Sequence, residues 1–371
     1  MLTRRHFCTG AATFAALASV STSIAAAPLR PSFDTDARGL AARARDARIR
    51  FGAATANYQL KDKAFRAAFL QDAALIVPEY EMKRSAMEKT RGQIDFEPCD
   101  DLLAFARVNN MAMRGHTLLW HRANPDWLEE AVLTTRDETL ITDYVTKVTT
   151  HYRGKLTSLD VVNEVIAPPD GRKDGLRNSF WLKAFGPSYI DMAYHAARAA
   201  APDMMLVYND WGCEQGAPEN DRFRAATLNF LEGALARGVP IDAYGMQGHL
   251  SAFGTQIDAY KLRKFCDAIT AMGLKLIITE HDVDDSGGSS NLDVRDRAVA
   301  DASARFLDVV LDCKALDTVL TWGLSNKFID APGWKARLSG YWPRKLPRDS
   351  NMAKTQMWHA MAKTFAHHAA N

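Results

Sequence analysis

The sequence predicts an α/β protein built as a single (β/α)8 TIM barrel. Eight short apolar runs follow one another from about residue 50, and amphipathic helical patterns lie between them. Repeated strand–helix units imply parallel pairing through right-handed crossovers, and eight such units close naturally into a barrel. The rival is an open, doubly wound sheet, which would usually carry a Gly-rich phosphate loop after its first strand. The stretch FGAATANYQL supplies no such loop.

The eight runs are mostly aliphatic rather than alternating, as strands covered on both faces should be. The predicted strands span residues 50–55, 74–79, 112–120, 157–164, 205–210, 243–250, 275–282 and 318–325.

The intervening helices show a three–four spacing of apolar residues. Phe223, Phe230 and Leu231 keep this spacing in a helix that Gly238 ends, and similar patterns precede the other strands. The DSGGSS segment directly follows the seventh strand, so we interpret it as a loop and not as a domain boundary. Residues 49–368 are therefore predicted to form one domain, with residues 28–48 as a lead-in.

The first 27 residues have the order of a twin-arginine signal peptide. Arg4 and Arg5 precede a weakly apolar, Ala-rich stretch that ends in small residues. We expect cleavage near Ala27 and export to the periplasm or the medium. No later stretch is apolar and long enough to cross a membrane.

The charge balance points to an uncharged substrate. Removing residues 1–27 takes away two arginines and no acid, so 46 basic residues become 44, against 44 acidic ones. Near neutrality argues against nucleic acid or a membrane surface as a partner. We expect a monomer.

The cysteines indicate neither a zinc site nor a fixed disulfide pattern. Cys8 lies in the signal, and the remaining four, Cys99, Cys213, Cys266 and Cys313, form no CxxC pair. Export permits disulfides, and buried free thiols are equally compatible with the sequence.

Polar residues terminate almost every predicted strand. Active sites of such barrels lie at the C-terminal strand ends, so these side chains should converge on one rim. They are Glu79, His116, His121, Asn163, Glu164, Asn209, Asp210, Gln247, His249, Glu280, Asp282 and Trp322.

Glu164 and Glu280 end the fourth and seventh strands and form the central candidate pair. Two carboxylates on either side of a bond are what glycoside hydrolysis needs, one protonated and one ionised. Each residue also has a structural interpretation: a glutamate at a strand end can be a rim salt-bridge partner. His116, His121 and His249 could be buried structural histidines, and Trp127 is expected in the core.

The motifs resemble glycoside hydrolase family 10, the endo-β-1,4-xylanases. The matching segments are EYEMK, RGQIDF, MRGHTLLWHRANPDWL, LDVVNE, LVYND, GVPIDAYGMQGHL, IITEHDV and TWG. The resemblance implies a TIM barrel and a retaining double displacement without cofactor or metal. It also implies that Glu280 is the nucleophile and Glu164 the general acid/base.

The same resemblance assigns supporting roles. Asn163 would bond the 2-hydroxyl of the sugar, and His249 would contact Glu280 while Asp282 orients it. Glu79 would reach the next sugar outward, and Asn209 and Asp210 would support the site. The residues expected to line the sugar pocket are Lys83, His116, Trp120, Gln247 and Trp322.

Several positions depart from the family pattern, and the resemblance implies that these changes affect the sugar-binding side of the cleft. They are Tyr80, Arg84, His281, Asn326 and Asp330, the last standing where a pocket-capping Trp is expected. Trp334 or Trp342 could take the place of that tryptophan.

The sequence leaves alternatives to an exported xylanase. One is a β-glycanase or β-glycosidase of altered specificity, and another is a carbohydrate-binding barrel without catalysis. A metal-dependent hydrolase is disfavoured, because no HExxH occurs and His116 and His121 are poorly spaced as ligands. Full activity in a chelator would remove that last alternative.

Overall fold

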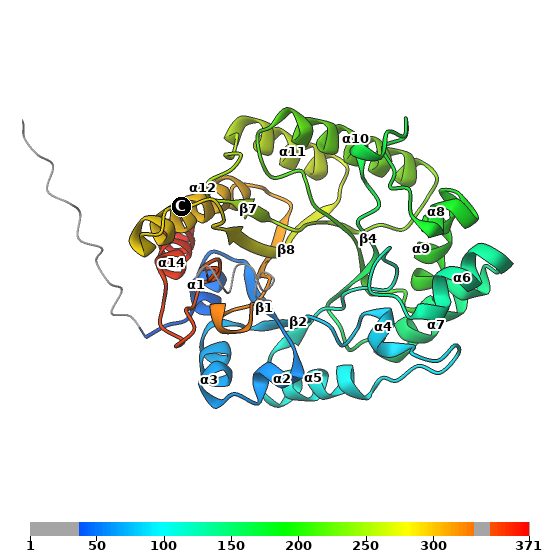
Figure 1. The fold of residues 1–371 in the computed structure, drawn as a ribbon, viewed down its shortest axis with the longest axis horizontal. Coiled ribbons are helices and arrows are strands. Elements are labelled where there is room, and N and C mark those ends of the chain that lie inside the picture. Colours follow the sequence, from blue (N-terminus) through cyan, green and yellow to red (C-terminus); the bar gives the residue numbers. More distant parts are fainter. Residues whose placement is uncertain (1–36, 330–341, 371) are drawn as a thin grey trace, which may run out of the picture. The chain divides into compact units, whose positions relative to one another are not determined.

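The computed structural model describes residues 37–329 and 342–370. The predicted signal peptide therefore lies outside the described residues, as do Asp330 and Trp334. Figure 1 looks down the barrel, with the strands around its centre and the helices forming an outer ring.

The strands form one closed, parallel sheet, which confirms the predicted fold class. The strand order is β3-β2-β1-β9-β8-β6-β5-β4, with β7 paired to β8. Isolated parallel bridges from Gly115 to Leu159 and from Leu119 to Val162 join the segment after β3 to β4 and so close the ring. The strands are β1 Arg50–Thr55, β2 Leu75–Pro78, β3 Ala112–Met113, β4 Ser158–Asn163, β5 Met205–Asp210, β6 Ala243–Met246, β7 His249–Ser251, β8 Lys275–Asp284 and β9 Leu316–Thr321.

Two of the eight predicted strands differ in form from the prediction. The third is regular only over Ala112–Met113, and the residues after it join β4 through isolated bridges and through the contacts of Arg114 and His116 with Asp160. The sixth run divides into β6 and β7, because Gly248 between them has a φ of +79°. Glycine adopts this left-handed conformation without the penalty of a side chain.

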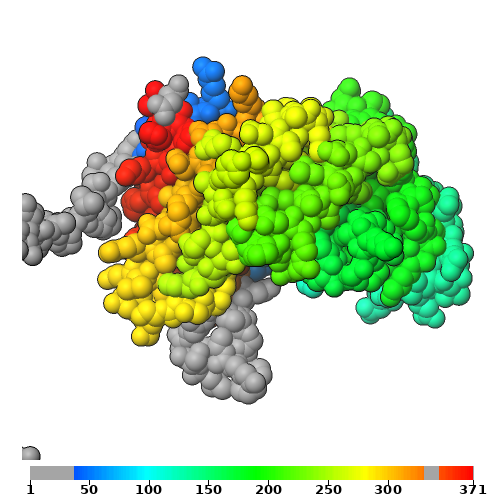
Figure 2. Space-filling model, turned by 90° about the horizontal axis from the view of Figure 1, so that it is seen from above, coloured from blue at the N-terminus to red at the C-terminus, as the bar shows by residue number. Residues whose placement is uncertain are grey.

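Helices follow the strands in the expected alternation. They are α1 Leu40–Asp46, α2 Asn57–Leu60, α3 Lys63–Asp72, α4 Arg84–Met87, α5 Glu97–Val108, α6 Asp126–Thr135, α7 Thr139–Tyr152, α8 Phe180–Phe185, α9 Ser188–Ala200, α10 Pro218–Ala236, α11 Ala259–Ala271, α12 Leu292–Leu311 and α14 Gln356–Ala369, with short 3-10 turns at Pro168–Asp170 and Asn326–Phe328. In Figure 2 the green to yellow segments, which carry α10, α11 and α12, form one continuous face. None of the described helices is long and apolar enough to cross a membrane.

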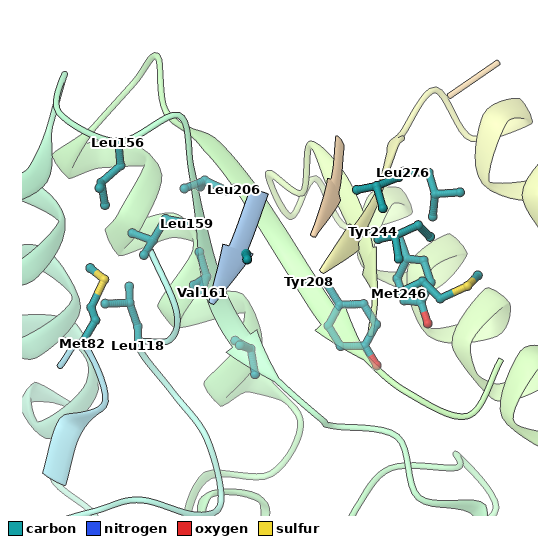
Figure 3. Packing of buried hydrophobic residues seen from close by; sticks show 14 of the residues in the cluster. Met82, Leu118, Leu156, Leu159, Val161, Leu206, Tyr208, Tyr244, Met246 and Leu276 are labelled. Carbon is teal, nitrogen blue, oxygen red and sulfur yellow. The ribbon is translucent and has the colours of Figure 1, made fainter. Parts of the chain in front are cut away.

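The larger core lies between the sheet and the helices. Tyr208 of β5 meets Phe230 of α10 edge-on, and Tyr244 of β6 meets Phe265 of α11 in the same way. Figure 3 shows members of this layer, including Leu206, Tyr208, Tyr244 and Leu276. Burying such side chains gains roughly 1.5–3 kcal/mol each, so this layer holds the helical ring against the strands.

A smaller cluster fills the barrel interior and supports the site from below. It consists of Ala54, Leu75, Val77, Val207, Ala243, Ile277 and Leu320. Because side chains alternate along a strand, Leu206 and Tyr208 face the helices, whereas Val207 faces the barrel axis. On β8 the register shifts between Ile278 and His281. Such a bulge re-aims side chains.

Helix α1 falls within the predicted lead-in and packs on the barrel. Leu40 and Ala44 are buried, and the Leu40 amide donates to Asp72 Oδ1 at 3.2 Å. Asp72 also accepts from Arg348 and from Trp358 of α14. One buried carboxylate therefore joins both ends of the described chain. Within the described residues, the four cysteines Cys99, Cys213, Cys266 and Cys313 are free and buried.

Candidate active site

Glu164 is the first residue after β4 and has an unusual backbone conformation. Its φ is +57°, in the left-handed region that non-glycine residues rarely occupy and that costs about 1–3 kcal/mol. Its amide donates to Asn209 O at 2.9 Å, and its carbonyl accepts from Arg177 Nε at 2.7 Å. These two bonds fix where the side chain points.

The Glu280 carboxylate lies on β8 within a set of donors. Oε1 accepts from Asn209 Nδ2 at 2.8 Å, and Oε2 lies 3.2 Å from His249 Nε2. His116 Nδ1 lies 3.9 Å from Oε1. Burial opposes ionisation, yet the hydrogen bond from His249 and the charges of His116 and His249 outweigh it, so the pKa of Glu280 is lowered. Glu280 is therefore held ionised.

His249 is held between two carboxylates. Its Nδ1 lies 2.8 Å from Asp282 Oδ1, opposite the contact of Nε2 with Glu280. Burial disfavours the imidazolium, but Asp282 and Glu280 together raise the pKa of His249 well above its usual value. The charges of His249 and Lys345 overcome the burial of Asp282 and lower the pKa of its carboxyl.

Glu164 has different neighbours from Glu280. Gln247 Nε2 donates to Glu164 Oε1 at 3.1 Å, and His121 Nδ1 lies 3.9 Å from Oε2. Burial, Arg177 and Arg122 lower the pKa of His121 to about 4. Glu164 therefore meets a neutral amide and a neutral imidazole at pH 6–7, whereas Glu280 meets the Asn209 amide and the His249 imidazolium.

Both glutamates line one open cavity of about 360 Å³. Nine of the predicted residues lie on its wall: Lys83, His116, Trp120, Asn163, Glu164, Gln247, His249, Glu280 and Trp322. Lys83 Nζ lies 5.3 Å from the ring centre of Trp120 and 5.4 Å from that of Trp322. This distance suits a cation–π interaction, which places the ammonium between two aromatic walls.

Glu79 lies in the neighbouring cavity, of about 180 Å³, which shares Trp322 with the first. Gln59 Nε2 donates to Glu79 Oε2 at 2.6 Å. The two cavities therefore adjoin through one aromatic side chain, and Glu79 stands one step away from the paired glutamates.

Asn209, Asp210 and Asp282 support the cavity wall from behind. Asn209 Nδ2 donates to Asn163 Oδ1 at 2.9 Å as well as to Glu280, so it links the ends of β4 and β8. Asp210 Oδ2 accepts from the Ile166 amide at 2.9 Å. Burial is the main reason that the pKa of Asp210 rises to about 7.

Sequence reasoning missed several residues of the site. Arg122, Arg177 and Trp211 line the main cavity, and Gln59 and Lys345 line its neighbour. Arg122 directly follows the predicted WH pair, so adjacency was a usable signal. Arg177 and Lys345 lie on loops that are distant in sequence from the ends of β4 and β8, which they contact, and no spacing rule predicts those contacts.

Three of the departures from the family pattern do not line either of these two cavities. Arg84 is buried, pairs with Glu88 and lies 4.0 Å over the Tyr144 ring. His281 is buried against Ser303. Asn326 is also buried, and its backbone carbonyl accepts from Trp342 Nε1.

Tyr80, Trp342 and Trp127 also lie outside both cavities. Tyr80 is 53% exposed and Trp342 is 42% exposed, and neither lines a cavity wall. Trp342 therefore does not cap the pocket. Trp127 packs against the core, as expected.

The described residues offer no metal site. Across residues 37–329 and 342–370, no group of three or more His, Cys, Asp or Glu side chains is arranged to hold an ion. The chemistry that this cavity presents is that of carboxylates, amides and imidazoles.

A parallel barrel that presents two carboxylates in one cavity at its C-terminal strand ends has the architecture of a glycoside hydrolase. The chain belongs to this class and, within it, to glycosyl hydrolase family 10, whose sequence model matches residues 39–364.

Curated relatives include endo-1,4-beta-xylanase B of Thermotoga neapolitana, 31% identical over 263 residues that cover 70% of this chain and 72% of that protein. Exoglucanase XynX of Acetivibrio thermocellus is 32% identical over 230 residues. These cover 58% of this chain and 20% of the exoglucanase, so the chain spans only about a fifth of that protein's length.

Solved structures show the same fold. Xylanase 10B of Thermotoga petrophila RKU-1, in complex with xylobiose, matches with a TM-score of 0.77 and 26% identity, covering 89% of this chain and 98% of that one. A family 10 enzyme of Paenibacillus barcinonensis matches with a TM-score of 0.75 and 28% identity, covering 88% and 97%.

Proposed function

We propose that the protein is a retaining endo-β-1,4-xylanase that cuts internal bonds of xylan by double displacement. The observation that carries this proposal is that two carboxylates in one cavity have different hydrogen-bonding and charged neighbours. Glu280 accepts from Asn209, contacts His249 and is held ionised, whereas the Glu164 carboxylate accepts from the Gln247 amide and lies 3.9 Å from His121. Hydrolysis by two carboxylates needs this division, because one must attack as an anion while the other delivers a proton.

Glu280 would be the nucleophile. In the first step a carboxylate oxygen of Glu280 attacks the anomeric carbon and forms a glycosyl ester. Glu164 donates its proton to the departing oxygen, so that the sugar leaves as a neutral alcohol. In the second step Glu164, now a base, takes a proton from water as that water attacks the same carbon and releases Glu280. Two inversions give net retention.

The surrounding residues would bind and orient the sugar. Asn163, at the end of β4, would bond the 2-hydroxyl, and the Asn209 side chain contacts it at 2.9 Å. Trp120 and Trp322 offer flat apolar faces, and the Lys83 ammonium lies between them. The remaining proposed contacts are His116, Gln247 and, for the next sugar outward, Glu79.

We also propose export, on the basis of Arg4, Arg5 and the Ala-rich stretch that follows. Replacing both arginines with lysine should leave the protein in the cytoplasm, whereas the unchanged chain should appear outside it. Unaltered export of the Lys–Lys variant would contradict a twin-arginine route.

Product analysis tests the proposed activity directly. The protein is incubated with xylan and xylo-oligosaccharides, and the anomeric proton is followed by NMR from the first minutes. Retention predicts that the β-anomer appears first and then mutarotates, and internal cleavage predicts oligosaccharides before xylose. First appearance of the α-anomer would contradict double displacement.

A β-glycanase of other specificity is the second candidate, since a relative named exoglucanase matches part of the chain. A panel of xylan, cellulose and mixed-linkage glucan separates the two. Cleavage of a glucan with xylan left intact would favour the second candidate. If the protein is a carbohydrate-binding barrel without catalysis, the unchanged protein should turn over none of these substrates, and Glu280→Ala should make no difference.

A further inference from the structure

The segment that precedes α14 brings a lysine to the C-terminal end of β8. Lys345 Nζ lies 2.5 Å from Asp282 Oδ2, and the Lys345 carbonyl accepts from the Val283 amide at 3.3 Å. On either side, the Arg344 amide lies 3.3 Å from Asp285, and the Leu346 amide donates to Asn326 Oδ1 at 3.0 Å. Backbone bonds thus hold Lys345 against the strand that carries Glu280.

Lys345 completes a row of four alternating charges that ends at the proposed nucleophile. The row runs from Lys345 to Asp282 (2.5 Å), from Asp282 to His249 (2.8 Å) and from His249 to Glu280 (3.2 Å). Only 3% of Asp282 and 5% of Glu280 is exposed. With His249 protonated, two cations and two anions alternate and the net charge is zero.

We propose that Lys345 is a positioning residue that acts through Asp282 and His249 to keep the nucleophile Glu280 ionised in acidic solution. This inference rests on the proposed function, because it assigns a role within the same reaction. Lys345 lines the neighbouring cavity and not the one that holds Glu164 and Glu280.

The physical reason lies in the charge that would remain without Lys345. Asp282, His249 and Glu280 alone carry a net charge of −1 in a buried setting, where an uncompensated charge is costly. The row relieves that charge by taking up a proton, and Glu280 is one of the two carboxylates that can accept it. Loss of Lys345 therefore raises the pH at which Glu280 loses its proton.

The other charges around the row do not replace Lys345. Glu79 and Asp284 face Lys345 and are acidic. His281 neighbours Asp282, but its pKa falls to about 4 because of burial, so it is neutral at the pH of interest. On the far side, Glu214 faces His249 and adds another acid, and His116 lies near Glu280 and is bonded to Asp160.

The test is the pH dependence of kcat/KM for a soluble xylo-oligosaccharide. Lys345→Met removes the charge and the hydrogen bond, and Lys345→Gln removes the charge but keeps a donor. We expect both variants to move the acidic limb upward by about half a pH unit, which lowers kcat/KM about threefold at pH values below the limb. The loss of kcat/KM should be smaller near neutral pH than below the limb, and Lys345→Arg should restore the limb.

Lys275→Met is the matched control. Lys275 lies at the opposite end of β8, where its Nζ is 3.2 Å from Asp317 Oδ1. The Lys275→Met variant therefore loses a lysine ion pair on the same strand but leaves the residues of the site unchanged. Its acidic limb should coincide with that of the unchanged protein.

Several results would overturn the inference. A uniform fall in kcat/KM with an unmoved acidic limb would show a merely structural role for Lys345. A rise in KM alone would show that Lys345 contacts sugar from the neighbouring cavity. Should Lys345→Met fail to fold, NMR titration of the His249 imidazole in Lys345→Gln decides, since an unchanged His249 pKa contradicts the row of coupled charges. Failure of the proposed function looks different, because the unchanged protein would then not cleave the xylo-oligosaccharide at any pH.

Discussion

Replacing Asn209 with alanine should weaken the ionisation of Glu280, and it also removes the bond from Asn209 to Asn163 on the cavity wall. Asn209 is fully buried, does not line the cavity, and donates to Glu280 Oε1 at 2.8 Å. A hydrogen bond to a charged acceptor contributes about 1.5–3 kcal/mol. His116 Nδ1, 3.9 Å from the same oxygen, is too distant to replace it.

The expected magnitude follows from this one bond. A pKa change of one unit corresponds to about 1.36 kcal/mol, so losing the bond should raise the pKa of Glu280 by about 1–2 units. The assay is kcat/KM for a xylo-oligosaccharide between pH 4 and pH 8. The acidic limb should move upward by that amount, while kcat/KM near pH 8 should fall far less than at pH 4.

Thr279→Val is the matched control for the Asn209 variant. The Thr279 hydroxyl lies 2.6 Å from Asn209 Oδ1, so its removal disturbs the same amide but leaves the Nδ2 donor in place. Its limb should lie close to that of the unchanged protein. A limb that does not move in Asn209→Ala, or that moves equally in Thr279→Val, would refute the reasoning.

Three further predictions concern single side chains. Glu164→Ala should lower kcat on xylan by about 10²–10⁴. An aryl xylobioside whose aryl group leaves without protonation should still show a burst, and added azide should restore turnover with the β-glycosyl azide as product. Equal losses on both substrates would contradict the acid/base role. Asp210→Asn should flatten the dependence of the unfolding free energy on pH between pH 4 and 7. In the unchanged protein the folded state keeps a proton on Asp210 that the unfolded chain loses, so its stability falls with rising pH by up to roughly 4 kcal/mol. If urea titrations give the same change of unfolding free energy with pH in both proteins, the raised pKa of Asp210 is contradicted. Arg84→Met should destabilise the fold by about 3–5 kcal/mol, because the buried Glu88 loses its ion-pair partner. At temperatures below the lowered Tm, kcat/KM should be unchanged. A change in KM would indicate that Arg84 contacts the substrate.

Strand positions and the paired glutamates were predictable because both obey short-range rules. Aliphatic runs such as 205–210 coincide with the observed β5 Met205–Asp210, since strands covered on both faces need apolar residues throughout. A closed barrel then brings the strand ends together without further information. Glu164 and Glu280 therefore meet in one cavity although 115 residues separate them in the sequence.

The residues that orient the site were not predictable by the same rules. Arg177 donates to backbone carbonyls after β4, and Lys345 reaches Asp282 from a segment beyond β9. Their places depend on loop conformations, and loops show no hydrophobic period. Similarly, Arg114 and His116, which follow the short third strand, are both held by one buried acid, Asp160, and only tertiary structure reveals this pairing.

The departures from the family pattern show the limit of comparing motifs alone. Arg84 and His281 are polar where apolar residues were expected, which implied altered sugar binding. In the structure neither side chain lines the two cavities, and each has its own partner, Glu88 for Arg84 and Ser303 for His281. His281 directly follows Glu280 on β8, and neighbours on a strand face opposite sides of the sheet, so its side chain can pack away from the site.

Covalent trapping tests the central claim most directly. A 2-deoxy-2-fluoro xylobioside with a good leaving group forms the glycosyl ester quickly but releases it slowly, and peptide mass mapping then identifies the labelled side chain. We predict one equivalent of label on Glu280, with release accelerated by an added xyloside acceptor. Label on Glu164 or on any other carboxylate, or inactivation without a covalent adduct, would contradict the assignment of Glu280 as the nucleophile.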